Sequence, residues 1–263
     1  MGMELWCKHM TRLFLILLLA PAALTQNTFS LDGVSPLSTT LVEPDLHHVQ
    51  GIDIEGETLW VSSVDAKAGK GYLSKIALRS GRLLAQVEVQ QGNRIHPGGI
   101  MLDGDSVWIP VAEYDRDGPT TIERRNKHSL RVEASFEVHD HIGCIAAGKD
   151  RLVGASWGSR TVYQWTKAGR QLDRRPNPQP TQWQDLKMDG ALLIGSGDIA
   201  GKSGASEWVS LPELKLVRRV ALGKTDRGHS FAHEGMTYRK GKLYFLPEDA
   251  PSRLFAFKVP WAK

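Results

Sequence analysis

Short hydrophobic segments separated by tight polar turns recur along the chain from about residue 48 onward. The clearest copy covers residues 51–61 and returns at residues 99–109. In both copies, two short runs rich in β-branched and aromatic residues flank an acidic turn that contains glycine, a pattern that predicts a β-hairpin. No apolar stripe with the 3.6-residue period of a helix persists long enough to predict one.

Three weaker copies of this hairpin follow, so the repeats start near residues 48, 96, 141, 182 and 232. In most copies a second alternating pair follows a polar loop, which gives four strands in a unit of roughly 45 residues. The pattern predicts an all-β protein, a single five-bladed β-propeller over residues 28–263. A β-sandwich would also contain short strands and turns, but it would not repeat in this register.

The fifth copy ends early, because only residues 260–263 follow its third strand at 253–259. A blade without its outer strand would leave an unpaired edge, and proteins normally cover such edges. The segment 37–42, which precedes the first repeat, has the composition of a β-strand. We therefore predict that the ring closes by sharing strands from the N- and C-terminal parts of the chain.

Residues 1–25 have the pattern of a secretory signal peptide. Lys8 and Arg12 precede the apolar run 13–20, and small residues near Ala23 offer cleavage positions. The run is much shorter than the ~20 residues that a membrane span needs. We expect a cleaved, exported protein in the periplasm or outside the cell, with no membrane contact after cleavage.

The overall composition is that of a globular protein and narrows its partners. The chain has 33 Lys and Arg against 29 Asp and Glu, a net charge of +4, which is too small to favour nucleic acid. Cys7 would leave with the signal peptide, so Cys144 would have no disulfide partner and would be a small buried residue. We expect a monomer whose partner is a small molecule or an unidentified protein.

Histidines recur at one position of the repeat. Each hairpin has an apolar anchor residue near its start: Ile52, Ile100, Ile145, Leu186 and Met236. Four residues before the anchor, the first three copies have a histidine and the fourth has a glutamine, whereas in the fifth copy the histidine is displaced by one. These residues are His48, His96, His141, Gln182 and His233. The segments that enter the innermost strands of a propeller converge on one mouth of its central channel. We therefore expect these side chains to approach a common axis, with Gln50, Gln184 and Glu234 close behind.

Acidic residues follow the second strand of several copies and should open on the same face. They are Asp65, Glu113, Asp198 and Glu248. Histidines surrounded by carboxylates suit one divalent metal ion, for which the ligands would be His48, His96, His141 and His233. The same groups could instead bind a polar organic ligand, held by Gln50, Gln182, Gln184 and these four acids, with Glu234 or His233 as acid and base. A third interpretation is that the histidines only bond neighbouring backbone.

The segment 48–52 resembles the aromatic-Thr-Gln-Gly-Leu opening of plant-type glutaminyl cyclases, which are five-bladed propellers, and 71–84 is similar to their next strands. The chain also resembles uncharacterised exported bacterial propellers with a domain-of-unknown-function label. The resemblance implies the fold. It does not carry the cyclase activity over, because Gly98-Gly99-Ile100 stands where that family has Glu-Gly-Ile or Glu-Gly-Leu, and 182–186 lacks its Asn-Glu-Leu-Glu stretch.

Two classes of function fit these observations. One is a metal- or carboxylate-assisted hydrolase, lyase or cyclase that acts at the channel mouth. The other is a propeller that binds a ligand or a protein partner on the same face without catalysis. The sequence does not separate them, since the repeat brings the same loops together in both cases.

Overall fold

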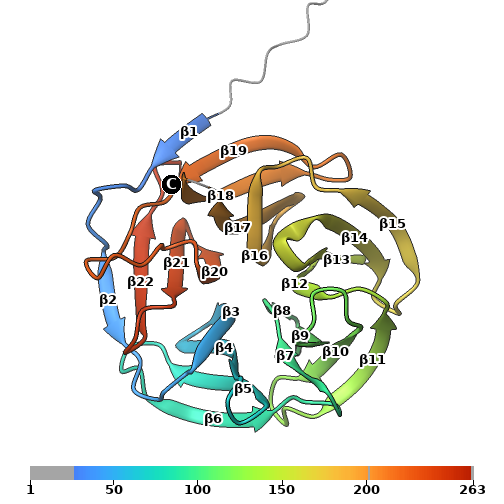
Figure 1. Ribbon diagram of the computed structural model, residues 1–263. Coiled ribbons are helices and arrows are strands. Elements are labelled where there is room, and N and C mark those ends of the chain that lie inside the picture. Colours follow the sequence, from blue (N-terminus) through green and yellow to red (C-terminus); the bar gives the residue numbers. More distant parts are fainter. Residues whose placement is uncertain (1–26, 201, 262–263) are drawn as a thin grey trace, which may run out of the picture.

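The computed structural model describes residues 27–200 and 202–261. Five sheets stand around a common axis, and each is one blade of a propeller (Figure 1). Within these residues the only helical element is a short 3-10 turn, η1 (Trp157–Ser159). The predicted all-β, five-bladed propeller is therefore confirmed.

Each blade is built from consecutive strands, which follow one another outward from the axis. Blade 1 contains β3 (His48–Glu55), β4 (Thr58–Asp65), β5 (Lys70–Ala77) and β6 (Leu83–Glu88). Blade 2 contains β7 (Arg94–Pro97) and β8 (Met101–Asp103), then β9 (Ser106–Glu113), β10 (Thr120–Asn126) and β11 (Val132–Val138). Blade 3 contains β12 (Ile142–Ala147), β13 (Arg151–Ser156), β14 (Thr161–Thr166) and β15 (Gln171–Pro176). Blade 4 contains β16 (Thr181–Asp189), β17 (Leu192–Ile199), β18 (Lys202–Ser210) and β19 (Lys215–Ala221). Blade 5 contains β20 (Glu234–Arg239), β21 (Lys242–Pro247) and β22 (Arg253–Lys258).

The N-terminal arm of the described chain closes the ring. Strand β2 (Ser38–Leu41) pairs antiparallel with β22 and completes blade 5, which confirms the predicted strand sharing. Before it, β1 (Asn27–Ser30) pairs in parallel with β19 as a fifth strand of blade 4. The sequence pattern did not predict this second pairing. One arm thus joins two neighbouring blades (Figure 1).

The burial of each strand follows its distance from the axis. The second strands β4 and β9 each contain six consecutive buried residues, because the neighbouring blades cover both of their faces. The outer strand β6 is mostly exposed. Five hydrophobic clusters lie between adjacent blades, and Trp60 and Trp108 are fully packed within two of them. These two tryptophans therefore serve packing between blades.

Close backbone contacts join the innermost strands of blades 1, 2 and 3. Gly99 donates its N–H to the carbonyl of Gly143 (2.8 Å) and accepts from the N–H of Ile145 (3.1 Å), so the inner strands of blades 2 and 3 bond directly. A Cβ on Gly51 would lie 2.4 Å from the Cα of Gly99, so only glycine fits there. The sequence predicted a site at the mouth of a channel; the structure has a blind recess there.

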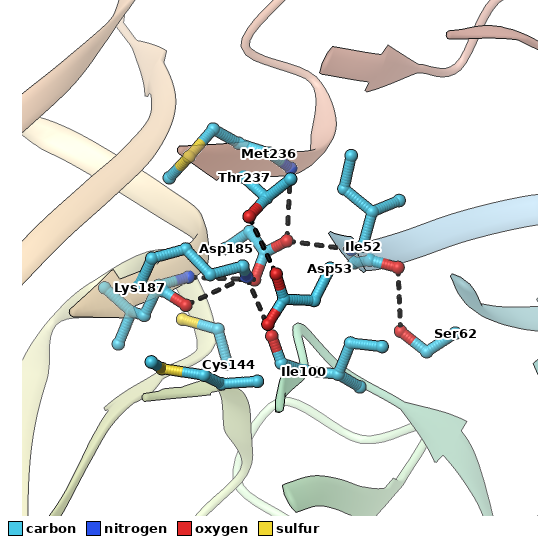
Figure 2. A network of polar contacts seen from close by, with 12 residues as sticks. Ile52, Asp53, Ser62, Ile100, Cys144, Asp185, Lys187, Met236 and Thr237 are labelled. Carbon is cyan, nitrogen blue, oxygen red and sulfur yellow. Dashed lines mark hydrogen bonds and ion pairs between the residues drawn. The ribbon is translucent and has the colours of Figure 1, made fainter. Parts of the chain in front are cut away.

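A charged pair adds to these contacts (Figure 2). Asp185 of blade 4 accepts hydrogen bonds from the backbone N–H groups of Ile52 in blade 1 (2.9 Å) and Met236 in blade 5 (3.1 Å). The Nζ of Lys187 donates to Asp185 Oδ1 (2.5 Å) and to the carbonyl of Ile100 in blade 2 (2.7 Å). Both side chains are almost completely buried. Asp185 and Lys187 together therefore link four blades.

Two further sequence predictions concern the signal peptide and Cys144. The predicted signal peptide, residues 1–25, lies outside the described residues. In the part of the chain that the structure describes, no helix has the length and hydrophobicity of a membrane span. Cys144 is fully buried in blade 3, and burial raises the pKa of its thiol, so it is a packing residue and not a nucleophile.

Candidate functional site

One face of the ring carries a recess built from two kinds of segment. The first residues of the innermost strands supply His48, Gln50 and His96, and the loops after the second strands supply Tyr114 and Trp157. These segments meet because adjacent strands are antiparallel, so the start of one strand lies beside the end of the next. The cavity has a volume of about 240 Å³, and its remaining lining residues are His141, Gly143, Ser156, Gly158, Trp183, Gln184, His233 and Glu234.

Four potential metal ligands converge on one side of this cavity. The Nε2 of His233 lies 3.0 Å from Oε1 of Glu234 and 3.4 Å from Oε2 of Glu248. The Nε2 of His48 lies 3.3 Å from Oε1 of Glu234 and 3.9 Å from Oε1 of Glu248. The ligand atoms of all four residues lie within 4.8 Å of one another. We refer to His48, His233, Glu234 and Glu248 as the His/Glu cluster.

These separations suit a tetrahedral zinc-class ion. Ligand atoms placed about 2.0–2.1 Å from such an ion are about 3.3–3.4 Å from each other at tetrahedral angles. The four separations between an imidazole nitrogen and a carboxylate oxygen, from 3.0 to 3.9 Å, lie around this value, and the two that involve Glu248 end on different oxygens of its carboxylate. Two imidazoles and two carboxylates are also a donor set that zinc-class ions accept. The residues present therefore fit a divalent ion.

Asp198 stands behind the cluster and orients His233. Its Oδ2 lies 2.7 Å from His233 Nδ1, while the hydroxyl of Ser230 donates to its Oδ1 (2.9 Å). A histidine that donates one ring N–H to a carboxylate presents the other nitrogen to a metal ion in a fixed direction. Asp198 thus holds His233 with Nε2 facing the cluster.

The imidazoles and carboxylates of the cluster shift one another's pKa values. Asp198 first, and then Glu234, raise the pKa of His233 to about 10, and the hydrogen bond to Glu234 raises the pKa of His48. Burial acts to raise the pKa of Glu234, but the hydrogen bonds from His233 and His48 lower it below its ordinary value. The imidazole of His233 is therefore protonated at neutral pH, and it faces the carboxylates of Glu234, Glu248 and Asp198.

Glu234 is held in an unusual backbone conformation. Its φ is 109°, a value that residues other than glycine rarely adopt, and its side chain is only 5% exposed. A strained backbone at a buried carboxylate is found where the surrounding structure fixes a side chain for a function. In this conformation Oε1 of Glu234 lies 3.3 Å from Nε2 of His48 and 3.0 Å from Nε2 of His233.

The opposite side of the cavity is aromatic. His96 lies edge-on to Tyr114 (ring centroids 4.6 Å apart) and parallel to Trp157 (6.0 Å), and His141 packs against both His96 and Trp157. Burial, with a smaller contribution from His141, lowers the pKa of His96 to about 3. Burial also lowers the pKa of His141, whose Nδ1 bonds the backbone carbonyl of Asp115 (2.8 Å). Both imidazoles are therefore neutral at physiological pH.

The structure separates the four histidines that were predicted as metal ligands. His48 and His233 belong to the His/Glu cluster, whereas His96 and His141 line the aromatic side. His141 agrees in part with the third interpretation, in which the histidines only bond neighbouring backbone, because its Nδ1 bonds a backbone carbonyl. Glu234, predicted as an acid or base, takes a cluster position beside His233.

The predicted ligand-binding residues divide in the same way. Gln50 and Gln184 line the cavity, Glu248 joins the cluster and Asp198 supports it. Gln182 is exposed and pairs with Asp198 across the long hairpin β16–β17. The simple alternation that placed it at the axis does not hold across the bulge between Trp183 and Asp185.

Asp65 and Glu113 also lie outside the cavity lining. The carboxylate of Asp65 is 3.8 Å from the ring of His47, and both Asp65 and Glu113 are the last residues of second strands. Of the four acids that were expected to bind a ligand, Asp198 and Glu248 are the two that reach the site.

Sequence reasoning did not select Tyr114 and Trp157 for the site. Both follow the second strand of their blade, the same repeat position that supplied the acidic candidates. At this repeat position only metal ligands and acid–base groups were considered as candidates. That choice selected acidic residues and passed over aromatic ones.

The fold and the site define a five-bladed β-propeller with a recess on one face, beside which four His and Glu side chains could hold a metal ion. Residues 62–182 match the model described as "Family of unknown function (DUF6454)". No curated protein sequence matches the chain. The predicted likeness to a family with a domain-of-unknown-function label is confirmed.

One solved structure supports the fold, and the fold alone. The crystal structure of Myxococcus xanthus glutaminyl cyclase is similar with a TM-score of 0.66 at 12% identity, over 88% of this chain and 97% of that chain. This confirms the distant structural likeness to glutaminyl cyclases. The Neurospora crassa Pan2 WD40 domain matches at a TM-score of 0.49 and 12% identity, over 84% of this chain and 68% of that one.

Proposed function

We propose that the protein binds one divalent ion of the zinc class at the His/Glu cluster and uses this site to bind and hydrolyse a small organic molecule in the recess. The observation that carries the proposal is the convergence of four ligand atoms within 4.8 Å of one another, with Asp198 holding one of the histidines. A bound ion of this class polarises a carbonyl oxygen and lowers the pKa of a water molecule.

The residues around this ion would have different roles in binding and catalysis. His48, His233 and Glu234 would hold it from the inner side, because Glu234 is buried and both imidazoles point toward it. Glu248 is 49% exposed at the outer rim of the cluster. If His48, His233 and Glu234 hold the ion, its fourth position is open to a water molecule. The carboxylate of Glu248 would then accept a proton from that water and return it to the leaving group. Gln50 and Gln184 line the floor and can hydrogen bond to a bound ligand.

Metal analysis of untagged protein tests the proposal. We expect one zinc or related ion per chain by mass spectrometry, and saturable zinc uptake by calorimetry after chelation and dialysis. Glu234→Gln should abolish tight uptake, because the amide supplies no negative charge to the buried position. His128→Gln, at an exposed turn outside the recess, is the matched control and should bind zinc like the unchanged protein.

Two results would contradict the proposal. One is zinc uptake below one equivalent per chain. The other is equal uptake by the Glu234→Gln variant, which would place the ion elsewhere. Hydrolysis of phenyl acetate by the zinc-loaded protein, lost on chelation and in Glu248→Gln, tests the catalytic part separately.

We also propose that residues 1–25 direct export and are then removed, as their charged, apolar and small-residue regions indicate. The metal site would then operate outside the cytoplasm. N-terminal sequencing of the exported fraction should give a start after residue 25. An intact Met1 in that fraction would contradict this proposal.

A further inference from the structure

Two aromatic side chains stand exposed at the rim of the recess. Tyr114 is 47% exposed and Trp157 is 37% exposed, and their rings are 6.2 Å apart in an edge-to-face arrangement. Large aromatic residues are normally buried, so an exposed pair beside a cavity indicates a surface that a ligand covers. The pair sits on loops of blades 2 and 3, opposite the His/Glu cluster.

The walls below this pair are neutral. His96 and His141 remain uncharged at physiological pH because burial lowers the pKa of both. His96 is 7% exposed, and its buried Nδ1 has no hydrogen-bond partner among the described residues. This half of the recess thus offers flat rings and no charge, an environment that suits a planar apolar group.

The charged groups of the recess contact one another. Among the described residues, no lysine or arginine lines the cavity, so no cationic side chain there is available to an anionic ligand. Each carboxylate of the cluster faces an imidazole, or would face the metal ion, and is therefore already paired when a cationic ligand arrives. The electrostatics therefore favour a ligand without net charge.

The absence of a side chain at Gly143 leaves space for such a ligand. The repeat position that carries Gln50, Gln184 and Glu234 in three blades is glycine in the other two. At Gly98 the glycine is required because a Cβ would lie 2.1 Å from the carbonyl oxygen of Gly143. A Cβ at Gly143 would meet its nearest described atom at 3.9 Å. A side chain there would enter the cavity without displacing the backbone. The cavity of about 240 Å³ is large enough for one substituted ring.

We propose that the recess binds an uncharged molecule that places a flat apolar ring against Tyr114 and Trp157 and directs a carbonyl or amide group toward the His/Glu cluster. The head-group part rests on the proposed metal function, whereas the ring and charge preferences follow from the recess alone. The ligand class is therefore a neutral aromatic amide or ester, rather than a phosphate ester, a carboxylate or an amine.

A series of small compounds that differ in one property at a time tests this inference. Benzamide, benzoate and benzamidine share a planar ring and similar size but are neutral, anionic and cationic, and acetamide keeps the neutral head without the ring. We would measure their dissociation constants by calorimetry and saturation-transfer NMR, with and without zinc. We expect benzamide to bind roughly tenfold or more tightly than each of the other three.

Two variants locate the binding. Trp157→Leu removes an exposed ring, and Gly143→Val fills the cavity; each should weaken benzamide roughly tenfold or more while zinc uptake stays unchanged. Leu172→Ala, an exposed apolar position on β15 away from the recess, is the control and should bind benzamide normally. Two outcomes would overturn the inference: benzoate, benzamidine or acetamide binding as tightly as benzamide, or unchanged benzamide binding by both recess variants.

The two proposals fail in different ways. If zinc does not bind but the benzamide preference and the effect of both variants remain, the metal function falls and the ligand class stands. If zinc binds as expected and benzamide shows no preference, only the ligand class falls.

Discussion

The stability of the ring should depend strongly on the buried pair of Asp185 and Lys187 at its axis. We predict that Lys187→Met lowers the free energy of unfolding by about 3–5 kcal/mol, the usual cost of removing one partner of a buried ion pair. Lys187 Nζ donates to Asp185 Oδ1 (2.5 Å) and to the carbonyls of Ile100 (2.7 Å) and Leu186 (2.9 Å). Methionine fills a similar volume but leaves these three acceptors without that donor. For a chain of this size the loss corresponds to a decrease in Tm of about 6–20 °C.

An exposed pair of the same length provides the control. Lys70 Nζ and Glu88 Oε1 are also 2.5 Å apart, but both side chains are largely exposed. We expect Lys70→Met to leave stability unchanged within error, because water screens such pairs. Urea denaturation followed by circular dichroism, with a chelator in all samples, compares the two variants without a contribution from metal.

The pH dependence of this cost provides a second measurement. Burial raises the pKa of Asp185, and Lys187 opposes that rise. Without the lysine the pKa of Asp185 rises further, so the folded variant keeps a proton that its unfolded form releases, and stability falls as pH rises. The cost of Lys187→Met should therefore be larger at pH 8 than at pH 5. A loss below about 1 kcal/mol at pH 8 would refute the view that this pair fastens the blades together.

Three further predictions concern the recess and the axis. Asp198→Asn should weaken zinc binding roughly 10- to 100-fold in a calorimetric titration, because the amide orients His233 less well; unchanged affinity would remove Asp198 from the site. The folded pKa of His96, about 3, lies below its unfolded value of about 6.5, so its contribution to stability should be lost as pH falls below 6.5, by up to about 1.4 kcal/mol per pH unit. His96→Leu should flatten that slope in acid denaturation curves, and an equal slope would assign it to other groups. Gly51→Ala should destabilise the ring by about 1–3 kcal/mol, because its Cβ would lie 2.4 Å from Gly99 Cα, whereas Gly143→Ala should be neutral in thermal unfolding.

The repeat made the fold predictable from sequence. Hairpins with acidic-glycine turns such as Gly56 and Gly104, both with positive φ, recur often enough to count the blades. The pairing of β2 with β22 followed from the missing outer strand of blade 5. The parallel pairing of β1 with β19 could not be predicted, because it joins segments about 190 residues apart and leaves no periodic pattern.

The site was only partly predictable, since its parts come from loops. Register in the repeat brought His48 and Gln50 to the recess, but bulges such as that between Trp183 and Asp185 break the alternation on which register arguments depend. The axial aspartate had a signal that sequence reasoning overlooked. At the repeat position of Asp185 in blade 4, the other four copies carry a glycine or a cysteine. These small residues leave room for the carboxylate of Asp185.

The N-terminal arm makes completion of the ring a late event in folding. Strand β2 pairs Ser38 with Ala256, so the last blade cannot be completed until nearly the whole described chain is available. Closing a loop of roughly 200 residues costs about 5 kcal/mol of chain entropy before any contact compensates for it. Until then β22 presents an unpaired edge that can associate with other chains. A chain that crosses a membrane unfolded would expose this edge after it has crossed. The protein concentration and the chaperones present there would determine what fraction of the chains closes correctly.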